Sequence, residues 1–92
     1  MQQELTRFLD DTGRLTKLPS KQRLRQYAYA YLAEKFEADS TYTEREVNAI
    51  LNAWHTFGDY FILRRGLIDG EFLQRLPDGS KYWKNKNLQE NT

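Results

Sequence analysis

The segment YTEREV, residues 42–47, restricts the fold of this 92-residue chain more than any other stretch. Thr43 and Glu46 have the spacing of a capping box, in which each side chain accepts a hydrogen bond from the backbone N–H of the other residue. The apolar positions that follow at helical spacing are Val47, Ile50, Leu51 and Trp54. The pattern predicts a helix that begins after Thr43 and runs to about Trp54. We expect Trp54 to pack between this helix and a later hairpin.

Another amphipathic helix is predicted upstream, over residues 21–36, with Ser20 after Pro19 as its N-cap. Its core-facing stripe consists of Leu24, Tyr27, Ala28, Tyr31, Leu32 and Phe36. Tyr29 falls on the outer face of this helix. Before it, residues 8–15 place the turn-forming sequence Asp-Asp-Thr-Gly between short apolar ends. That pattern predicts a small hairpin or an ordered loop.

A third helix and a hairpin complete the pattern. The helix covers about residues 59–69, after a short connection that contains Gly58, and we expect Gly70 to end it in the left-handed conformation. A strand over residues 72–76, a Pro-Asp-Gly turn and a strand over residues 80–84 form the hairpin. Three helices followed by a hairpin predict an α+β fold, a small winged helix-turn-helix-like domain in which the hairpin is the wing.

The length of the chain predicts a single domain, residues 1–92, with a core over about 18–84 and a solvated, flexible tail over 85–92. A content of 39% hydrophobic residues suffices for folding. The absence of cysteine excludes disulfides and thiolate metal sites. No apolar run reaches the length of a signal peptide or of a membrane span. We therefore expect a cytoplasmic protein without a membrane partner.

Residues that could carry chemistry are sparse. His55 is the single histidine, and together with Asp59 it is too little for a metal site. We interpret this pair as a hydrogen bond that orients a helix end, and Asp10 and Asp11 as turn residues. The sequence contains no glycine-rich phosphate loop, no Ser/His/Asp set and no nucleophilic cysteine. We expect neither enzyme activity nor a cofactor or metal.

Two adjacent arginines in the third helix are candidates for contact with a partner. At about 100° per residue, Arg65 points away from the core stripe of Leu63 and Leu67, whereas Arg64 lies on its flank. We therefore expect the protein to hold Arg64 in an ion pair and to leave Arg65 exposed. Asp69, four residues after Arg65, has the spacing of an intrahelical partner for it.

Two functions remain open, because winged helices bind both nucleic acids and proteins. A DNA-binding module of transcription regulation would contact duplex DNA through Arg65, Lys81 and Lys84. A protein-interaction or dimerisation module without DNA binding would use Phe61, Ile62 and Tyr29. The net charge of +1 gives no general argument for a polyanionic partner. A positive stripe over the third helix and the wing would favour DNA, and an apolar patch there would favour a protein.

Several short motifs follow one another along the chain. They are LPSK, YLAEKF, YTEREVN, the His55–Asp59 pair, LRR, the Ile68-Asp69-Gly70 helix end and DGSKYW. Together they make residues 18–83 resemble a bacterial family of unknown function, DUF2087. The resemblance implies a winged-helix-like fold and a regulatory setting, because some members are fused to repressor-type DNA-binding domains. Gly66 stands where the family usually has a longer helix-forming residue, and a glycine inside a helix costs about 1 kcal/mol relative to alanine.

Overall fold

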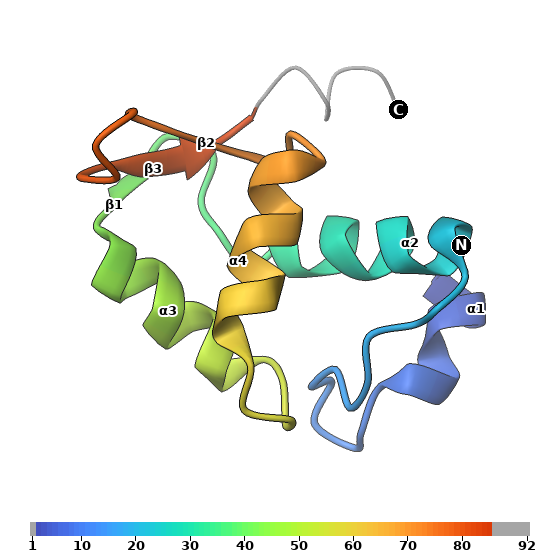
Figure 1. The fold of residues 1–92 in the computed structure, drawn as a ribbon. Coiled ribbons are helices and arrows are strands. Elements are labelled where there is room, and N and C mark those ends of the chain that lie inside the picture. The colour runs from blue at the N-terminus through green and yellow to red at the C-terminus, as the bar shows by residue number, and fades with distance from the viewer. Residues whose placement is uncertain (1, 86–92) are drawn as a thin grey trace.

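The computed structural model describes residues 2–85, so nearly all of the predicted tail lies outside the described residues. In chain order the elements are α1 (Gln2–Leu5), η1 (Thr6–Phe8), α2 (Gln22–Ala33), β1 (Thr41–Tyr42), α3 (Glu44–Ala53), α4 (Tyr60–Asp69), β2 (Leu73–Arg75) and β3 (Tyr82–Lys84). In Figure 1, α3 and α4 lie side by side below the sheet, and α2 extends from behind α4 toward α1.

Three short strands form one antiparallel sheet in the order β1–β3–β2. The predicted hairpin wing is confirmed, with Gln74 of β2 opposite Trp83 of β3. The sequence did not predict β1, whose Thr41 also pairs with Trp83, because two extended residues are too few for a periodic pattern. The order helix, strand, helix, helix, strand, strand is α+β and winged-helix-like, as predicted.

The helices α3 and α4 both begin at side-chain caps. Thr43 Oγ1 accepts from the Glu46 N–H at 3.1 Å, and Glu46 Oε1 accepts from the Thr43 N–H at 2.8 Å, so the capping box is confirmed. Asp59 caps α4, because its carboxylate accepts from the Ile62 N–H at 3.2 Å. Each cap supplies an acceptor to a first-turn amide that has no partner inside the helix.

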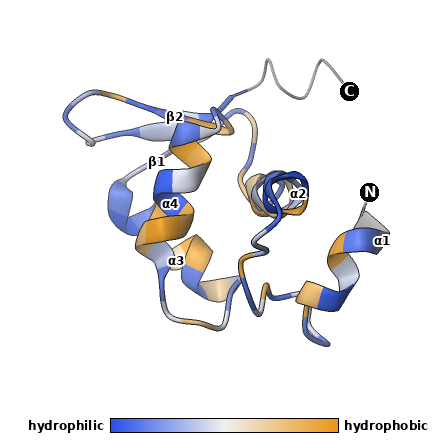
Figure 2. Cartoon of the chain, turned by 45° about the vertical axis from the view of Figure 1, so that its right-hand side comes forward, coloured by the Kyte–Doolittle hydropathy of each residue, from blue (hydrophilic) through white to orange (hydrophobic). Residues whose placement is uncertain are grey.

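The helix α2 differs from its prediction at both ends. It begins after Lys21, whose side chain makes no capping bond, so the expected cap at Ser20 is wrong. It ends at Ala33, and the chain continues in turns that still bury Phe36. The buried apolar core draws on every helix and strand from α2 onward except β1 and includes Leu24, Ala28, Leu32, Val47, Leu51, Leu63, Leu67, Leu73 and Tyr82. Figure 2 views α2 end-on and shows it beside α4.

The predicted N-terminal loop is ordered by a single carboxylate. Asp10 accepts hydrogen bonds from the backbone of Thr12 and Arg14 and from both of their side chains. Chiefly through the Arg14 N–H, these bonds lower the pKa of Asp10 to about 2. Leu9 pairs with Leu15 in an isolated antiparallel bridge, so the loop closes as a minimal hairpin.

Trp54 packs on this loop instead of the wing. Its carbonyl accepts from the Leu15 N–H at 2.8 Å, and the Lys35 ammonium lies 3.9 Å from the centre of its ring. The expectation that Trp54 lies between α3 and the hairpin is therefore wrong. The aromatic residue buried at the hairpin is Tyr82.

His55 is a buried structural residue. Its Nδ1 lies 2.6 Å from the Leu51 carbonyl oxygen, and its Nε2 accepts from the Asp59 N–H at 2.9 Å. These two partners fit the tautomer with its proton on Nδ1. The predicted link between His55 and Asp59 exists, but it uses the Asp59 backbone, because the carboxylate caps α4.

The C-terminal end of α4 places its left-handed residue one position later than expected. Gly70 has a φ of −85°, whereas Glu71 has a φ of 63°. The Phe72 N–H donates to the Leu67 carbonyl at 2.8 Å and the Glu71 N–H donates to the Ile68 carbonyl at 3.0 Å, which is a Schellman motif with Glu71 at C′. The Asn85 side chain donates to the Glu71 carbonyl at 2.7 Å and holds this turn.

Candidate functional site

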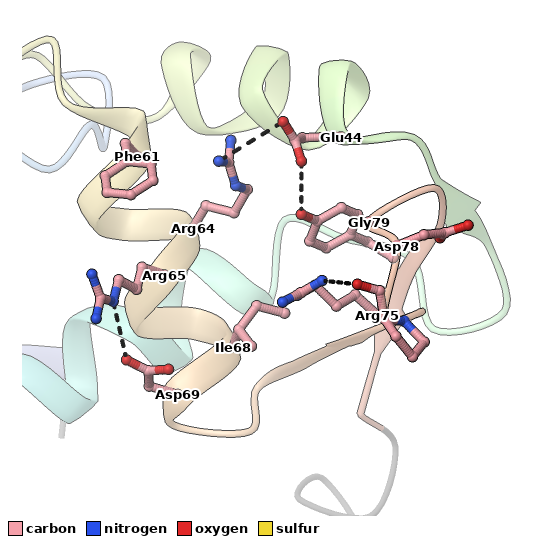
Figure 3. A pocket seen from close by; sticks show the side chains of 11 residues that line it. Glu44, Phe61, Arg64, Arg65, Ile68, Asp69, Arg75, Asp78 and Gly79 are labelled. Atoms are coloured by element: carbon pink, nitrogen blue, oxygen red, sulfur yellow. Dashed lines mark hydrogen bonds and ion pairs between the residues drawn. The ribbon is translucent and has the colours of Figure 1, made fainter.

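A groove of about 420 Å³ separates α4 from the wing. We call it the α4–wing groove. The residues that line it are Glu44, Phe61, Arg64, Arg65, Ile68, Asp69, Arg75, Pro77, Asp78, Gly79 and Tyr82. Figure 3 shows α4 on one side and the hairpin turn on the other, with Glu44 reaching in from the start of α3. The three guanidinium groups and three carboxylates of the lining balance in formal charge.

Arg64 belongs to a polar network that joins α4 to α3. Its Nη1 donates to Asn48 Oδ1 at 2.5 Å, and its Nη2 lies 3.9 Å from Glu44 Oε2. The other oxygen of Glu44 accepts from the Tyr82 hydroxyl at 3.1 Å, which extends the network to β3. The Arg64 side chain is only 14% exposed, so the prediction that the protein holds it is confirmed. Burial and the bond to Glu44 raise the pKa of Tyr82.

Arg65 lies on the solvent side of α4, about 100° around the helix from Arg64. Its side chain is 70% exposed, as predicted, and its only ion pair among residues 2–85 is a loose contact of 3.8 Å between Nε and Asp69. An exposed pair at this spacing contributes little to stability. Arg65 is therefore available to a partner, although Asp69 offsets much of its charge at the surface.

The wing carries its own charged residues. Arg75 Nη1 donates to the carbonyl oxygens of Leu76 and Pro77, at 3.2 and 3.1 Å, and so braces the turn. Hydrogen bonds from the Ser80 hydroxyl and backbone N–H lower the pKa of Asp78. Lys81 is exposed as predicted, whereas Asp78 places a carboxylate on the same turn. The wing is thus not a purely basic element.

Lys84 is not available for the contact that the sequence suggested. It is buried, and its ammonium lies 3.4 Å from the Phe36 carbonyl oxygen. Side chains alternate along a strand, so Lys84 shares its face with the buried Tyr82, not with Lys81 three positions away. The expected DNA contact at Lys84 is therefore wrong as a surface position.

Tyr29 is also buried, with 5% exposure, so its expected position on the outer face of α2 is wrong. Its ring covers Gly66 of α4 so closely that a Cβ at Gly66 would lie 2.1 Å from Cζ of the ring. The glycine in the middle of α4 thus permits a close approach between two helices. That glycine was the sequence signal that could have revealed the contact, because an isolated helical glycine often has a packing reason.

The exposed large hydrophobic side chains gather on α4 and the wing. Phe61 is 55% exposed and Ile62 42%, as predicted, and Tyr60 and Leu76 are each 38% exposed. We call these four residues the apolar patch. Phe61 also lines the α4–wing groove, and its ring lies 5.5 Å from the Arg64 guanidinium. The α4–wing face therefore combines a charge-balanced groove with exposed apolar side chains.

Within residues 2–85 there is no cluster of three or more His, Cys, Asp or Glu side chains that could hold a metal ion. None of the described helices is long and apolar enough to cross a membrane.

Fold and surface together define a winged-helix-like domain whose α4 and wing present a charge-balanced, partly apolar face. Residues 14–84 match the family described as "Uncharacterized protein conserved in bacteria (DUF2087)". The chain therefore belongs to that family, which confirms the resemblance seen in its motifs. Searches of curated proteins and of solved structures found no match.

Proposed function

We propose that this chain is a non-enzymatic, cytoplasmic winged-helix interaction module, and that its α4–wing face binds a second copy of the chain. The observation that carries the proposal is the apolar patch. Every large hydrophobic side chain counted as exposed in the described part of the chain lies on α4 or the wing. Large apolar side chains exposed beside charged ones are typical of interaction sites in soluble proteins.

The charges beside the patch favour self-association. An isologous two-fold contact uses the same surface on both subunits. That surface must therefore be complementary to itself. The α4–wing groove offers Arg64, Arg65 and Arg75 against Glu44, Asp69 and Asp78. With Phe61 near the two-fold axis, Arg65 of one copy would exchange Asp69 of its own helix for Asp69 of the other. The same balance gives DNA little electrostatic attraction.

The test is the mass in solution of wild type and of Phe61→Ser, measured by light scattering at two concentrations about a hundredfold apart. We expect wild type to shift toward the dimer mass at the higher concentration and Phe61→Ser to remain monomeric. Ala53→Ser, an exposed change at the end of α3 outside the groove, is the control and should behave as wild type. A wild-type chain that is monomeric throughout would refute self-association.

Duplex DNA is the second candidate, and it is favoured by the exposed cations Arg65, Arg75 and Lys81 on α4 and the wing. Three phosphate contacts would give a salt slope of only about −2.7 in log K against log salt. Arg65→Ala would reduce that slope by about one unit. A slope close to −2.7 with a labelled duplex, together with a monomeric mass, would favour DNA over the self-association proposed above.

A further inference from the structure

A second groove, of about 390 Å³, lies on the other side of α4. It runs between the N-terminal turns of α2 and the C-terminal half of α4. Ser20, Gln22, Arg25, Gln26, Tyr29 and Asp69 supply its polar lining, and Gly66 and Gly70 complete the lining. We call it the α2–α4 groove. Its size lies within the range of small-molecule sites.

The Tyr29 hydroxyl is the feature that marks this groove as a site. The residue is only 5% exposed, yet its hydroxyl has no hydrogen-bond partner among residues 2–85. No buried side-chain nitrogen or oxygen atom of the described residues lacks a hydrogen-bond partner, so this hydroxyl still reaches solvent at the groove while the rest of the side chain is covered. Burial raises the pKa of Tyr29, so the group carries its proton at neutral pH and is free to donate into the groove.

The two ends of the groove have opposite electrostatic character. At one end α2 begins without a side-chain cap, so its first-turn amides point out with the positive end of the helix dipole. Arg25 adds a full positive charge there; its Nε is fixed by a 3.1 Å bond to the Pro19 carbonyl, and it has no carboxylate partner among the described residues. This end suits a carboxylate.

The other end is negative. Asp69 closes α4, at the negative end of that helix dipole, and its only ion-pair partner within residues 2–85 is the loosely placed Arg65. Arg25, Asp69 and Tyr29 line the same groove, and the two charges shift the pKa of the Tyr29 hydroxyl in opposite directions. A simple anion would be repelled by Asp69, and a simple cation would be repelled by Arg25.

We propose that the α2–α4 groove binds a small zwitterion of the α-amino acid class. The ligand's carboxylate lies at Arg25 and the first turn of α2, its ammonium lies at Asp69, and the Tyr29 hydroxyl bonds to it between these ends. Binding gives the Tyr29 hydroxyl a ligand atom in place of solvent. This site shares Asp69 with the α4–wing groove, whereas the rest of its lining comes from α2 and its N-terminal approach and from Gly66 and Gly70.

The test is a titration of the full chain followed by amide chemical shifts, with glycine, L-alanine and L-glutamine as probes and with acetate, methylammonium and inorganic phosphate as single-charge controls. We expect saturable shifts at Gln22, Arg23 and Leu24 and at the Gly66–Gly70 turn for at least one amino acid. The single-charge probes should bind at least about tenfold more weakly, since each loses one charged contact. Equal binding by acetate, methylammonium or phosphate, or no saturable shift with any amino acid, would overturn the proposal.

Two variants separate binding from folding. Tyr29→Phe removes only the unpartnered hydroxyl and should weaken amino-acid binding about tenfold. The matched control is Tyr31→Phe, whose hydroxyl donates to the Gly13 carbonyl at 2.7 Å away from the groove, and which should bind as wild type. Gln22→Glu places a carboxylate in the first turn of α2, where it favours the helix but repels the ligand. Undiminished binding in Gln22→Glu would refute the site even if Tyr29→Phe failed to fold.

Discussion

The inner and outer faces of α4 carry different kinds of contact. On the inner face, Arg64 is bonded to α3, and Gly66 lies beneath the ring of Tyr29. On the outer face, Phe61 and Arg65 are exposed to solvent. Two arginines adjacent in sequence therefore have opposite roles. A helix turns about 100° per residue, so one step along the chain decides between structure and surface.

The largest effect should come from Gly66→Ala. Alanine gains about 1 kcal/mol of helix propensity over glycine, but its Cβ would overlap the Tyr29 ring, and overpacking typically costs about 1–3 kcal/mol or more. The overlap involves ring atoms that cannot bend aside. We expect a net loss of about 2 kcal/mol in urea denaturation. A gain in stability would show that Tyr29 does not pack on α4.

Arg64→Ala should come next. The guanidinium is largely buried and bonded to Asn48, and its loss leaves the Asn48 and Glu44 oxygens with fewer donors. Because hydrogen bonds to charged groups contribute about 1.5–3 kcal/mol and the Glu44 contact is long, we expect a loss of about 1.5 kcal/mol by the same assay. A loss no greater than that of Arg65→Ala would contradict the assignment of the two faces.

Glu71→Gly should stabilise the protein. Glu71 is held at a φ of 63°, a conformation that costs a side-chain-bearing residue about 1–2 kcal/mol and glycine almost nothing. Glycine loses more backbone entropy on folding, so we expect a net gain of about 1 kcal/mol in thermal or urea unfolding. The control is Gly70→Ala, whose Cβ would lie 3.0 Å from the Phe72 ring and which should destabilise. A loss of stability in Glu71→Gly would indicate that the Glu71 side chain itself supports the turn.

The smallest effect is expected for Arg65→Ala. Its ion pair with Asp69 is long and exposed, and surface substitutions usually change stability by no more than about 0.5 kcal/mol. Denaturation should therefore be nearly unchanged, whereas dimer mass or DNA retention should respond if the outer face is functional. A change in stability as large as that of Arg64→Ala would remove the contrast between the faces.

The sequence predicted what local patterns encode. The capping box at Thr43, the helix over about residues 59–69 and the hairpin around Gly79 each depend on nearby residues, and each is present. The prediction that the protein holds Arg64 and leaves Arg65 exposed is also confirmed, because the spacing of residues alone decides on which face of a helix each one lies. The capping box also predicted the first residue of α3 correctly.

The remaining features depend on contacts between distant segments. Tyr29 is buried because Gly66 of another helix accommodates it, and Lys84 is buried where its ammonium meets the carbonyl of Phe36, which is distant in sequence. Trp54 packs on the N-terminal loop through Leu15, a partner that no local pattern indicates. The α2–α4 groove likewise exists only where two helix ends meet. The periodicity of a sequence indicates which face of a helix or strand is buried. It does not identify the segment that covers that face.

The central position of β3 has a consequence for the chain during synthesis. β1 and β2 are both made before the strand that joins them, since β3 comes last of the three. While residues 82–84 are still inside the ribosome, β1 has no strand partner, and Glu44 lacks the Tyr82 hydroxyl. The helices and the bond between Arg64 and Asn48 can form before then, but the sheet and the bond between Tyr82 and Glu44 close only after β3 emerges. A nascent chain stalled before Tyr82 should therefore remain sensitive to proteases, and release of a few more residues should protect it abruptly.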